Sequence, residues 1–143
     1  MFKYLYKRGN KMKIEIDIDS LGDFHGGCLG KGVERKHRWG YERWIVNEGE
    51  YCAKLLVLEN GEYSSKHYHS EKKETFIVLG GRVLLHRWYG DDSSDSEGET
   101  MKVSDMATIP SGITHKFRGI ETPAVILEVS THHDDGDTYR VEE

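Results

Sequence analysis

The sequence predicts an all-β protein, a sandwich or barrel of short antiparallel strands. Short runs rich in β-branched and aromatic residues recur along the chain, and no segment has a helical period. The runs are separated by Asn-Glu-Gly, Asn-Gly, Gly-Gly and Pro-Ser-Gly, which favour turns. A chain of 143 residues with 36% hydrophobic and 10% aromatic residues can bury one core. We therefore expect one globular domain of the β-sandwich or β-barrel class.

The first strand is expected after residue 13, where Ile14, Ile16 and Ile18 alternate with acidic residues. We interpret residues 1–13 as an N-terminal appendage and residues 14–143 as the domain. Five glycines in residues 20–32 predict a loop, and the acidic segment 90–99 predicts a solvated one. The other expected strands are Tyr41–Val46, Tyr51–Leu58, Ser64–His69, Thr75–Val78, Arg82–Tyr89, Thr100–Val103, Met106–Ile109, His115–Arg118 and Ala124–Val129.

Charge and composition exclude several classes of partner. The net charge is −5, and no broad basic stretch is present, so nucleic acid is not expected as a partner. No apolar run approaches the roughly 20 residues that a membrane-spanning helix needs. The N-terminus lacks an apolar stretch of signal-peptide length, and Cys28 and Cys52 are not spaced as a metal-binding pair. We expect a cytoplasmic protein without a membrane partner.

Four residues form a candidate metal site. His67 and His69 are two apart in an expected strand, so both side chains lie on one face. Glu74 follows at the start of the next apolar run, and His115 comes from the segment PSGITHKF. Three imidazoles and one carboxylate suit a divalent Zn, Fe, Mn, Co or Ni ion. A bare His-x-His is more often a surface pair, so the flanking turn residues matter to this interpretation.

The spacing around these residues resembles the cupin superfamily. Gly61-x5-His67-x-His69-x4-Glu74-x6-Gly81 resembles its first motif, and Pro110-x-Gly112-x2-His115 resembles its second. Ser104 stands where the second motif usually has glycine. The resemblance covers residues 40–130 and implies a double-stranded β-helix, a jelly-roll barrel with the metal inside. It also implies a homodimer.

Three further residues have candidate roles in chemistry. Glu128 interrupts the apolar run AVILEVS, so it is either a pocket carboxylate suited to act as a general base or a solvent-facing residue of an edge strand. Lys72 could stabilise a developing negative charge, or it is one of several solvated loop charges. Lys54, in the apolar run YCAKLLVL, either points into a wet cavity or extends out of the barrel.

A narrower resemblance concerns sugar-converting cupins. HRWGYERW at 37–44 is similar to a segment of phosphomannose-isomerase-type cupins, and EVSTHHDDGDTYR at 128–140 is similar to the end of the D-lyxose isomerase type. This resemblance implies proton transfer by Glu128 and Lys72, with Asp137 and Arg140, beside Lys54, binding the sugar. It implies an aldose–ketose isomerase of the D-lyxose/D-xylulose or D-mannose/D-fructose type that works through an enediol.

Two alternatives stay open at this point. One is a sugar-phosphate isomerase or a nucleotide-sugar epimerase, whose phosphate would need bases such as Lys54, Lys66, Arg87 and Arg118. The other is a cupin that binds a metal or a sugar without catalysis.

Overall fold

The computed structural model describes residues 3–5, 13–15, 33–91 and 95–142. The chain divides into two compact units, residues 1–32 and 33–143. In the first unit, β1 (Lys3–Leu5) and β2 (Lys13–Glu15) pair antiparallel. The expected boundary after residue 13 falls within this unit, and the expected strand positions Ile16 and Ile18 lie outside the described residues.

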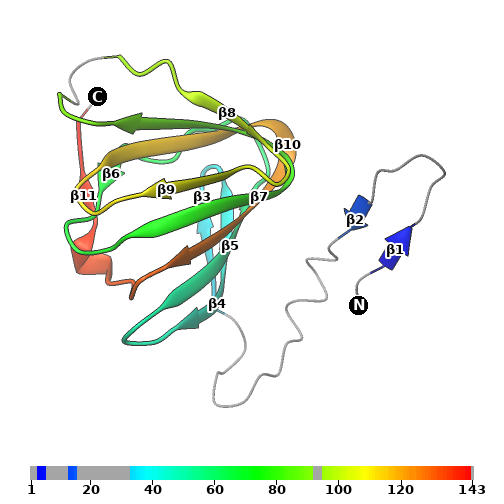
Figure 1. The fold of residues 1–143 in the computed structure, drawn as a ribbon, viewed down its shortest axis with the longest axis horizontal. Coiled ribbons are helices and arrows are strands. Elements are labelled where there is room, and N and C mark those ends of the chain that lie inside the picture. Colours follow the sequence, from blue (N-terminus) through cyan, green and yellow to red (C-terminus); the bar gives the residue numbers. More distant parts are fainter. Residues whose placement is uncertain (1–2, 6–12, 16–32, 92–94, 143) are drawn as a thin grey trace. The chain divides into compact units, whose positions relative to one another are not determined.

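The second unit is a curled antiparallel sheet of nine strands with one 3-10 turn, η2 (Asp135–Asp137) (Figure 1). One path through the sheet has the order β11-β6-β10-β5-β4-β3, and β7 pairs with β10, β8 and β9. The all-β jelly-roll class predicted from the sequence is thereby confirmed. No helix among the described residues is long and apolar enough to cross a membrane. The strands are β3 (Glu34–His37), β4 (Gly40–Asn47), β5 (Cys52–Leu58), β6 (His67–Tyr68), β7 (Glu74–Trp88), β8 (Glu99–Lys102), β9 (Met106–Ile109), β10 (Thr114–Ser130) and β11 (Tyr139–Arg140).

Two long strands replace four of the expected short ones. The Gly-Gly pair at 80–81 was expected to make a turn, but β7 continues through it. Its partner β10 shifts register at the same level, between Gly119 and Ile126, so the two strands bend together without reversing. Gly81 has φ +67, and a Cβ there would lie 2.3 Å from the Glu121 carbonyl oxygen. The glycine therefore permits a bend in a continuous strand where a hairpin turn was predicted.

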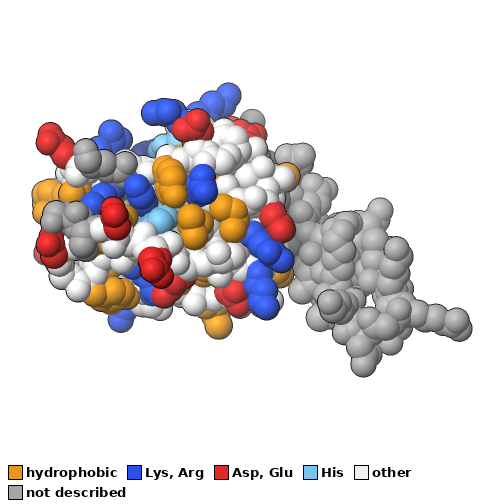
Figure 2. All heavy atoms as spheres, turned by 90° about the horizontal axis from the view of Figure 1, so that it is seen from above, with side chains coloured by type: hydrophobic (Ala, Val, Ile, Leu, Met, Phe, Trp, Pro, Cys, Tyr) orange, Lys and Arg blue, Asp and Glu red, His pale blue; other side chains and the backbone are white. Residues whose placement is uncertain are grey.

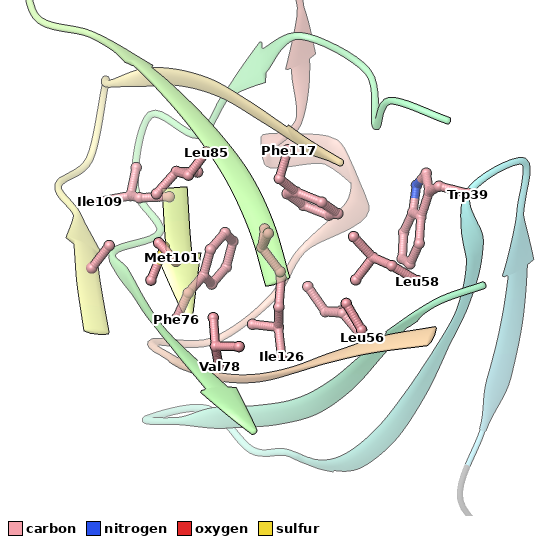
Figure 3. Close-up of a cluster of buried hydrophobic side chains, with 13 residues drawn as sticks. Trp39, Leu56, Leu58, Phe76, Val78, Leu85, Met101, Ile109, Phe117 and Ile126 are labelled. Atoms are coloured by element: carbon pink, nitrogen blue, oxygen red, sulfur yellow. The ribbon is translucent and has the colours of Figure 1, made fainter. Parts of the chain in front are cut away.

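The inward-facing positions change from charged to apolar along the two neighbouring strands β5 and β10. On β5 they are Lys54, then Leu56 and Leu58, and on β10 they are Glu128, then Ile126 and Ala124; all six are buried. Lys54 lies directly opposite Glu128 in the sheet, so the two charged positions share one level. Phe76, Val83, Leu85, Ile109 and Phe117 belong to the same buried apolar cluster as Leu56, Leu58, Ala124 and Ile126 (Figure 3). The core therefore fills one end of the barrel and leaves the other end polar.

Charges of both signs are interspersed on the described surface that Figure 2 shows. The visible face carries no broad region of one sign among the described residues (Figure 2).

Candidate metal centre and active site

Three histidines converge at the polar end of the barrel. His67 lies on β6, His69 follows that strand, and His115 lies on β10 directly opposite His67. Each ring places its Nδ1 at hydrogen-bonding distance from a backbone carbonyl, which can only accept. The carbonyls are those of Ser65, Asp137 and Ile113, at 2.8, 2.9 and 2.9 Å. Each Nδ1 is therefore the donor, and each Nε2 keeps its lone pair for a metal.

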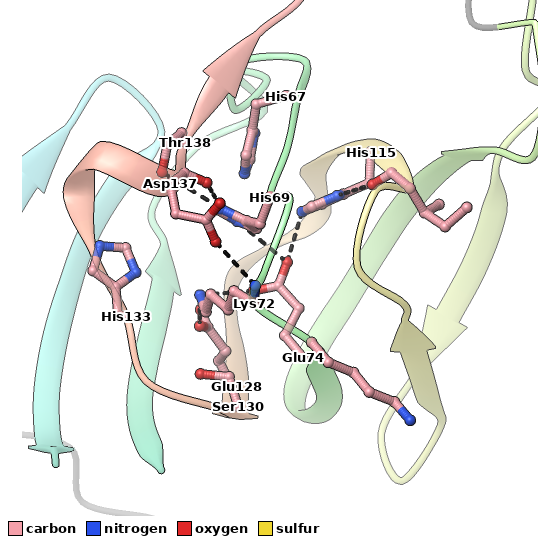
Figure 4. A network of polar contacts seen from close by, with 12 residues as sticks. His67, His69, Lys72, Glu74, His115, Glu128, Ser130, His133, Asp137 and Thr138 are labelled. Carbon is pink, nitrogen blue, oxygen red and sulfur yellow. Dashed lines mark hydrogen bonds and ion pairs between the residues drawn. The ribbon is translucent and has the colours of Figure 1, made fainter. Parts of the chain in front are cut away.

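The Glu74 carboxylate completes the cluster (Figure 4). One ligand atom from each histidine lies within 4.8 Å of the others. Glu74 Oε1 is 2.7 Å from His115 Nε2 and 3.7 Å from His69 Nε2. Both Oε1 and His115 Nε2 are buried and have no hydrogen-bond partner in the described part of the chain. Two acceptor atoms this close require a proton or a cation between them, so the residues fit a divalent metal.

Burial and neighbouring charges together set the protonation of His67, His69 and Glu74. Burial, and then the neighbouring His115, lower the pKa of His67 to about 3. Burial also lowers the pKa of His69, although the charge of Glu74 opposes it. Burial alone would raise the pKa of Glu74, but its contacts with His115 and Lys72 outweigh this and lower that pKa well below the ordinary range. Neutral imidazoles beside an ionised carboxylate are the state that a metal binds.

Lys72 connects Glu74 to Glu128. Its Nζ is 2.9 Å from Glu74 Oε2 and is also hydrogen-bonded to Glu128 Oε1, and all three side chains are at most 5% exposed. Burial and the charge of Glu74 raise the pKa of Glu128, although Lys72 and Lys54 oppose them. Both carboxylates raise the pKa of Lys72 against the effect of burial. Of the alternatives left open above, the structure places Glu128 and Lys72 inside the cavity.

Asp137 has a different position from the one expected of a sugar ligand. Its carboxylate accepts hydrogen bonds from the backbone N–H groups of Ser70, Glu71 and Lys72, and from the Ser70 hydroxyl. The side chain is not among those that line the cavity. The Asp137 carboxylate thus holds the loop between His69 and Glu74 in place, because its oxygens accept hydrogen bonds from that loop.

Lys54 is buried and points into the cavity, where it meets a histidine that the sequence analysis missed. Lys54 Nζ lies 3.1 Å from His133 Nδ1, 3.7 Å from Glu42 Oε2 and 4.0 Å from the centre of the Trp44 ring. His133 Nε2 lies 2.9 Å from Asp135 Oδ1. An ammonium group only donates, so it fixes Nδ1 as the acceptor and Nε2 as the donor to Asp135. His133 was missed because it follows the strand in a polar segment without any metal-motif spacing.

These groups line a cavity of about 330 Å³ that holds the three histidines, Glu74, Lys72, Glu128, Lys54 and His133. Arg140 also lines it, and Trp39 and Phe117 supply apolar wall. Of the other bases proposed for phosphate, Arg87 is hydrogen-bonded to Glu99 on the outer surface, and neither it nor Lys66 or Arg118 lines this cavity. The cavity therefore combines a candidate metal centre, a buried acid–base pair and an aromatic wall.

Comparison with known families agrees with this architecture. The family model described as "Cupin domain" matches residues 54–130, more than half of the chain. The chain is a cupin. This cupin is 33% identical over 118 residues to the uncharacterised protein YdbB of Bacillus subtilis (strain 168), covering 81% of its own length and 90% of YdbB.

Solved structures show the same fold. KdgF from Halomonas sp. matches with a TM-score of 0.62 and 11% identity, covering 73% of this cupin and 89% of KdgF. Oxalate decarboxylase from Bacillus subtilis matches with a TM-score of 0.66 and 19% identity, over 77% of this cupin and 30% of that chain. At these identities the likeness concerns the fold.

Proposed function

We propose that this cupin is a metal-dependent isomerase that interconverts an aldose and a ketose. The observation that carries the proposal is the buried chain Glu128–Lys72–Glu74, which joins a carboxylate with a raised pKa to the candidate metal centre. A carboxylate with a raised pKa holds a proton taken from carbon more readily than an ordinary carboxylate does. The sugars we expect are of the D-lyxose/D-xylulose or D-mannose/D-fructose type.

The reaction moves protons within one sugar molecule and needs no oxidant or second substrate. Glu128 takes the proton from the carbon α to the carbonyl, which gives an enediolate, and returns it to the former carbonyl carbon. The hydroxyl proton of the α carbon moves to the former carbonyl oxygen, through the enediol, so that all atoms stay within the one sugar molecule. Lys72 donates a hydrogen bond towards the oxygen on which negative charge develops. His67, His69, Glu74 and His115 would hold the metal ion, which supplies Lewis acidity to polarise the carbonyl. Mn is one candidate, since oxalate decarboxylase, a protein of this fold, contains Mn(II) centres.

The cavity wall suits an open-chain sugar. Trp39 and Phe117 offer apolar surface to the carbon chain, while Lys54 and His133 offer polar atoms to its hydroxyls. Lys54 keeps this position because its ammonium group contacts both His133 and Glu42. Hydroxyl recognition by such fixed polar groups supplies the orientation that proton transfer between neighbouring carbons requires.

Replacement of Glu128 by glutamine tests the proposal. Glutamine keeps the volume and can still bond Lys72, but it cannot accept a proton at neutral pH. Isomerase turnover on D-mannose and D-lyxose should fall at least about 100-fold. Exchange of the C2 proton with deuterated solvent should fall in parallel, because the same group performs that step. Metal content and melting temperature, measured on the same sample, should stay near those of the parent protein.

The matched control is Glu121→Gln, at an exposed glutamate on the same strand that is paired with Arg82. This variant should isomerise normally. A Glu128→Gln protein that is folded, metal-loaded and fully active would place the base elsewhere. A parent protein that binds metal and sugar but converts neither sugar would instead support a non-catalytic cupin.

A further inference from the structure

Arg140 differs from the other cations of the cavity in having no side-chain partner among the described residues. Lysine and arginine line the cavity at four positions, and three of them are neutralised by neighbouring acids. Arg35 is paired with Asp135 at 2.8 Å, Lys54 with Glu42 at 3.7 Å, and Lys72 with Glu74 at 2.9 Å. Within the described part of the chain, the structure gives the Arg140 side chain no hydrogen bond, ion pair or ring contact. Its charge is therefore available to a ligand.

The fold holds Arg140 beside the candidate metal centre. Arg140 lies on β11 directly opposite His67 on β6, so the two side chains project from the same face of the sheet. The strand end is fixed on both sides of this residue. The Val141 N–H donates to the Lys66 carbonyl at 2.9 Å, and the Tyr139 ring stacks on Tyr68 with centroids 5.1 Å apart. Arg140 thus has a fixed base and an exposed head at the mouth of the cavity.

A second cavity, of about 470 Å³, adjoins the first at this point. Arg140, Ser65, Trp39 and His37 line both cavities. The rings of His37 and Trp39 stack in parallel there, with centroids 4.6 Å apart and planes 7° apart. A ligand whose reacting end reaches the histidine cluster can therefore extend past Arg140 into the second space.

We propose that Arg140 forms the centre of an anion-binding subsite, which holds a carboxylate or phosphate group at the non-reacting end of the sugar substrate. The guanidinium fork matches the oxygens of either group with two parallel hydrogen bonds. The other cations that line the first cavity are paired with acidic residues. In the second cavity Arg38 is paired with Glu62, and the Lys66 ammonium group lies over the Trp88 ring, so an anionic group gains most at Arg140. This inference rests on the proposed function, and it names the substrate class as an acidic or phosphorylated sugar.

The test compares three sugars that differ only at carbon 6: D-mannose, D-mannuronate and D-mannose 6-phosphate. Their dissociation constants for the full-length, metal-loaded protein are measured by calorimetry at low and high salt. At least one charged sugar should bind about tenfold more tightly than mannose, and this preference should weaken as salt rises, because Arg140 is exposed. The better of the two charged sugars identifies whether carboxylate or phosphate is the preferred group.

Arg140→Gln should remove the preference, so that the charged sugars bind no more tightly than mannose. Arg140→Lys should restore part of it, since lysine keeps the charge but not the fork. Arg82→Gln removes an exposed arginine that lines neither cavity, and it should keep the full preference. Equal affinity for all three sugars, or an undiminished preference in a folded Arg140→Gln protein, would overturn the subsite.

Binding and turnover measurements test the subsite and the isomerase activity separately. A charged-sugar preference that depends on Arg140, without conversion of any sugar, supports the subsite and refutes the isomerase. Turnover of mannose by the parent protein, with no gain from either charged group in binding or turnover, refutes the subsite and supports the isomerase.

Discussion

Removal of the Lys72 ammonium should destabilise this cupin more than almost any other single substitution at the site. Lys72 is 3% exposed and contacts two carboxylates that are similarly buried. At the 2.9 Å separation from Glu74, the Coulomb attraction is about 6 kcal/mol with an effective dielectric constant of 20. Desolvation cancels much of this in the intact trio, but removing one partner leaves buried charge unpaired and costs about 3–5 kcal/mol. Lys72→Met should therefore lower the melting temperature by more than about 10 °C.

A double-mutant cycle measured on the metal-free protein isolates the cause. Lys72→Met leaves two buried carboxylates without their cation, and Glu128→Gln removes one of these carboxylates. The double variant should therefore lose less free energy of unfolding than the two single variants lose together, by at least about 1 kcal/mol. Denaturant unfolding gives the four free energies of unfolding. The neighbouring Lys73 is exposed, and Lys73→Met should change the free energy of unfolding by no more than about 0.5 kcal/mol. Additive effects, or a Lys72→Met cost as small as that of Lys73→Met, would refute the charge trio as described.

Three other outcomes follow from the site. His115→Ala should strongly reduce the metal content measured by elemental analysis. His86→Ala, at a buried histidine outside the cavity, should leave the metal content unchanged. A His115→Ala protein with the metal content of the parent would exclude His115 as a ligand. The pKa of His67 is lowered to about 3, so between about pH 6.5 and 3 the unfolded chain binds a proton at this residue that the folded, metal-free protein does not. The free energy of unfolding of the metal-free protein should therefore fall as the pH drops through that range. A flat profile from denaturant unfolding would contradict this. Asp137→Asn should cost about 1–3 kcal/mol in the same assay, because the charge that accepts three backbone N–H groups is lost, and an unchanged midpoint would show that the loop needs no carboxylate.

The strand pattern was predictable because local signals decide it. Alternation and turn residues located Met106–Ile109 without error and Tyr51–Leu58 to within one residue. The turn predicted at the Gly-Gly pair was wrong, because the same dipeptide occurs both in hairpin turns and at bends in long strands. Which of the two forms depends on the partner strand β10. Ser104 is the opposite case: the resemblance expected glycine there, and the residue has φ 77, so this turn needs the left-handed conformation whichever residue occupies it.

The site was predictable to the extent that its residues fall within a strand period or a motif. His67, His69, Glu74 and His115 come together as their spacing indicated. The sequence could not decide the directions of Lys54 and Glu128, because their neighbours are apolar on both faces. Register decides it: the two lie opposite one another at the level where the inner face changes from apolar to charged. Contacts across more than sixty residues, such as those of Asp137 with the loop after His69, leave no local signal.

The segment after β10 supplies much of what is particular to this site. The family match ends at residue 130, yet the carbonyl that orients His69 belongs to Asp137, and the same residue fixes the loop that carries Lys72. His133 and Arg140 line the cavity from this segment as well. The barrel thus provides the converging ligands and the apolar wall, while the C-terminal segment positions them and forms one side of the entrance. Because catalysis depends on where the protein fixes charge and hydrogen-bond donors, differences in this segment are a direct way for one cupin barrel to serve different substrates.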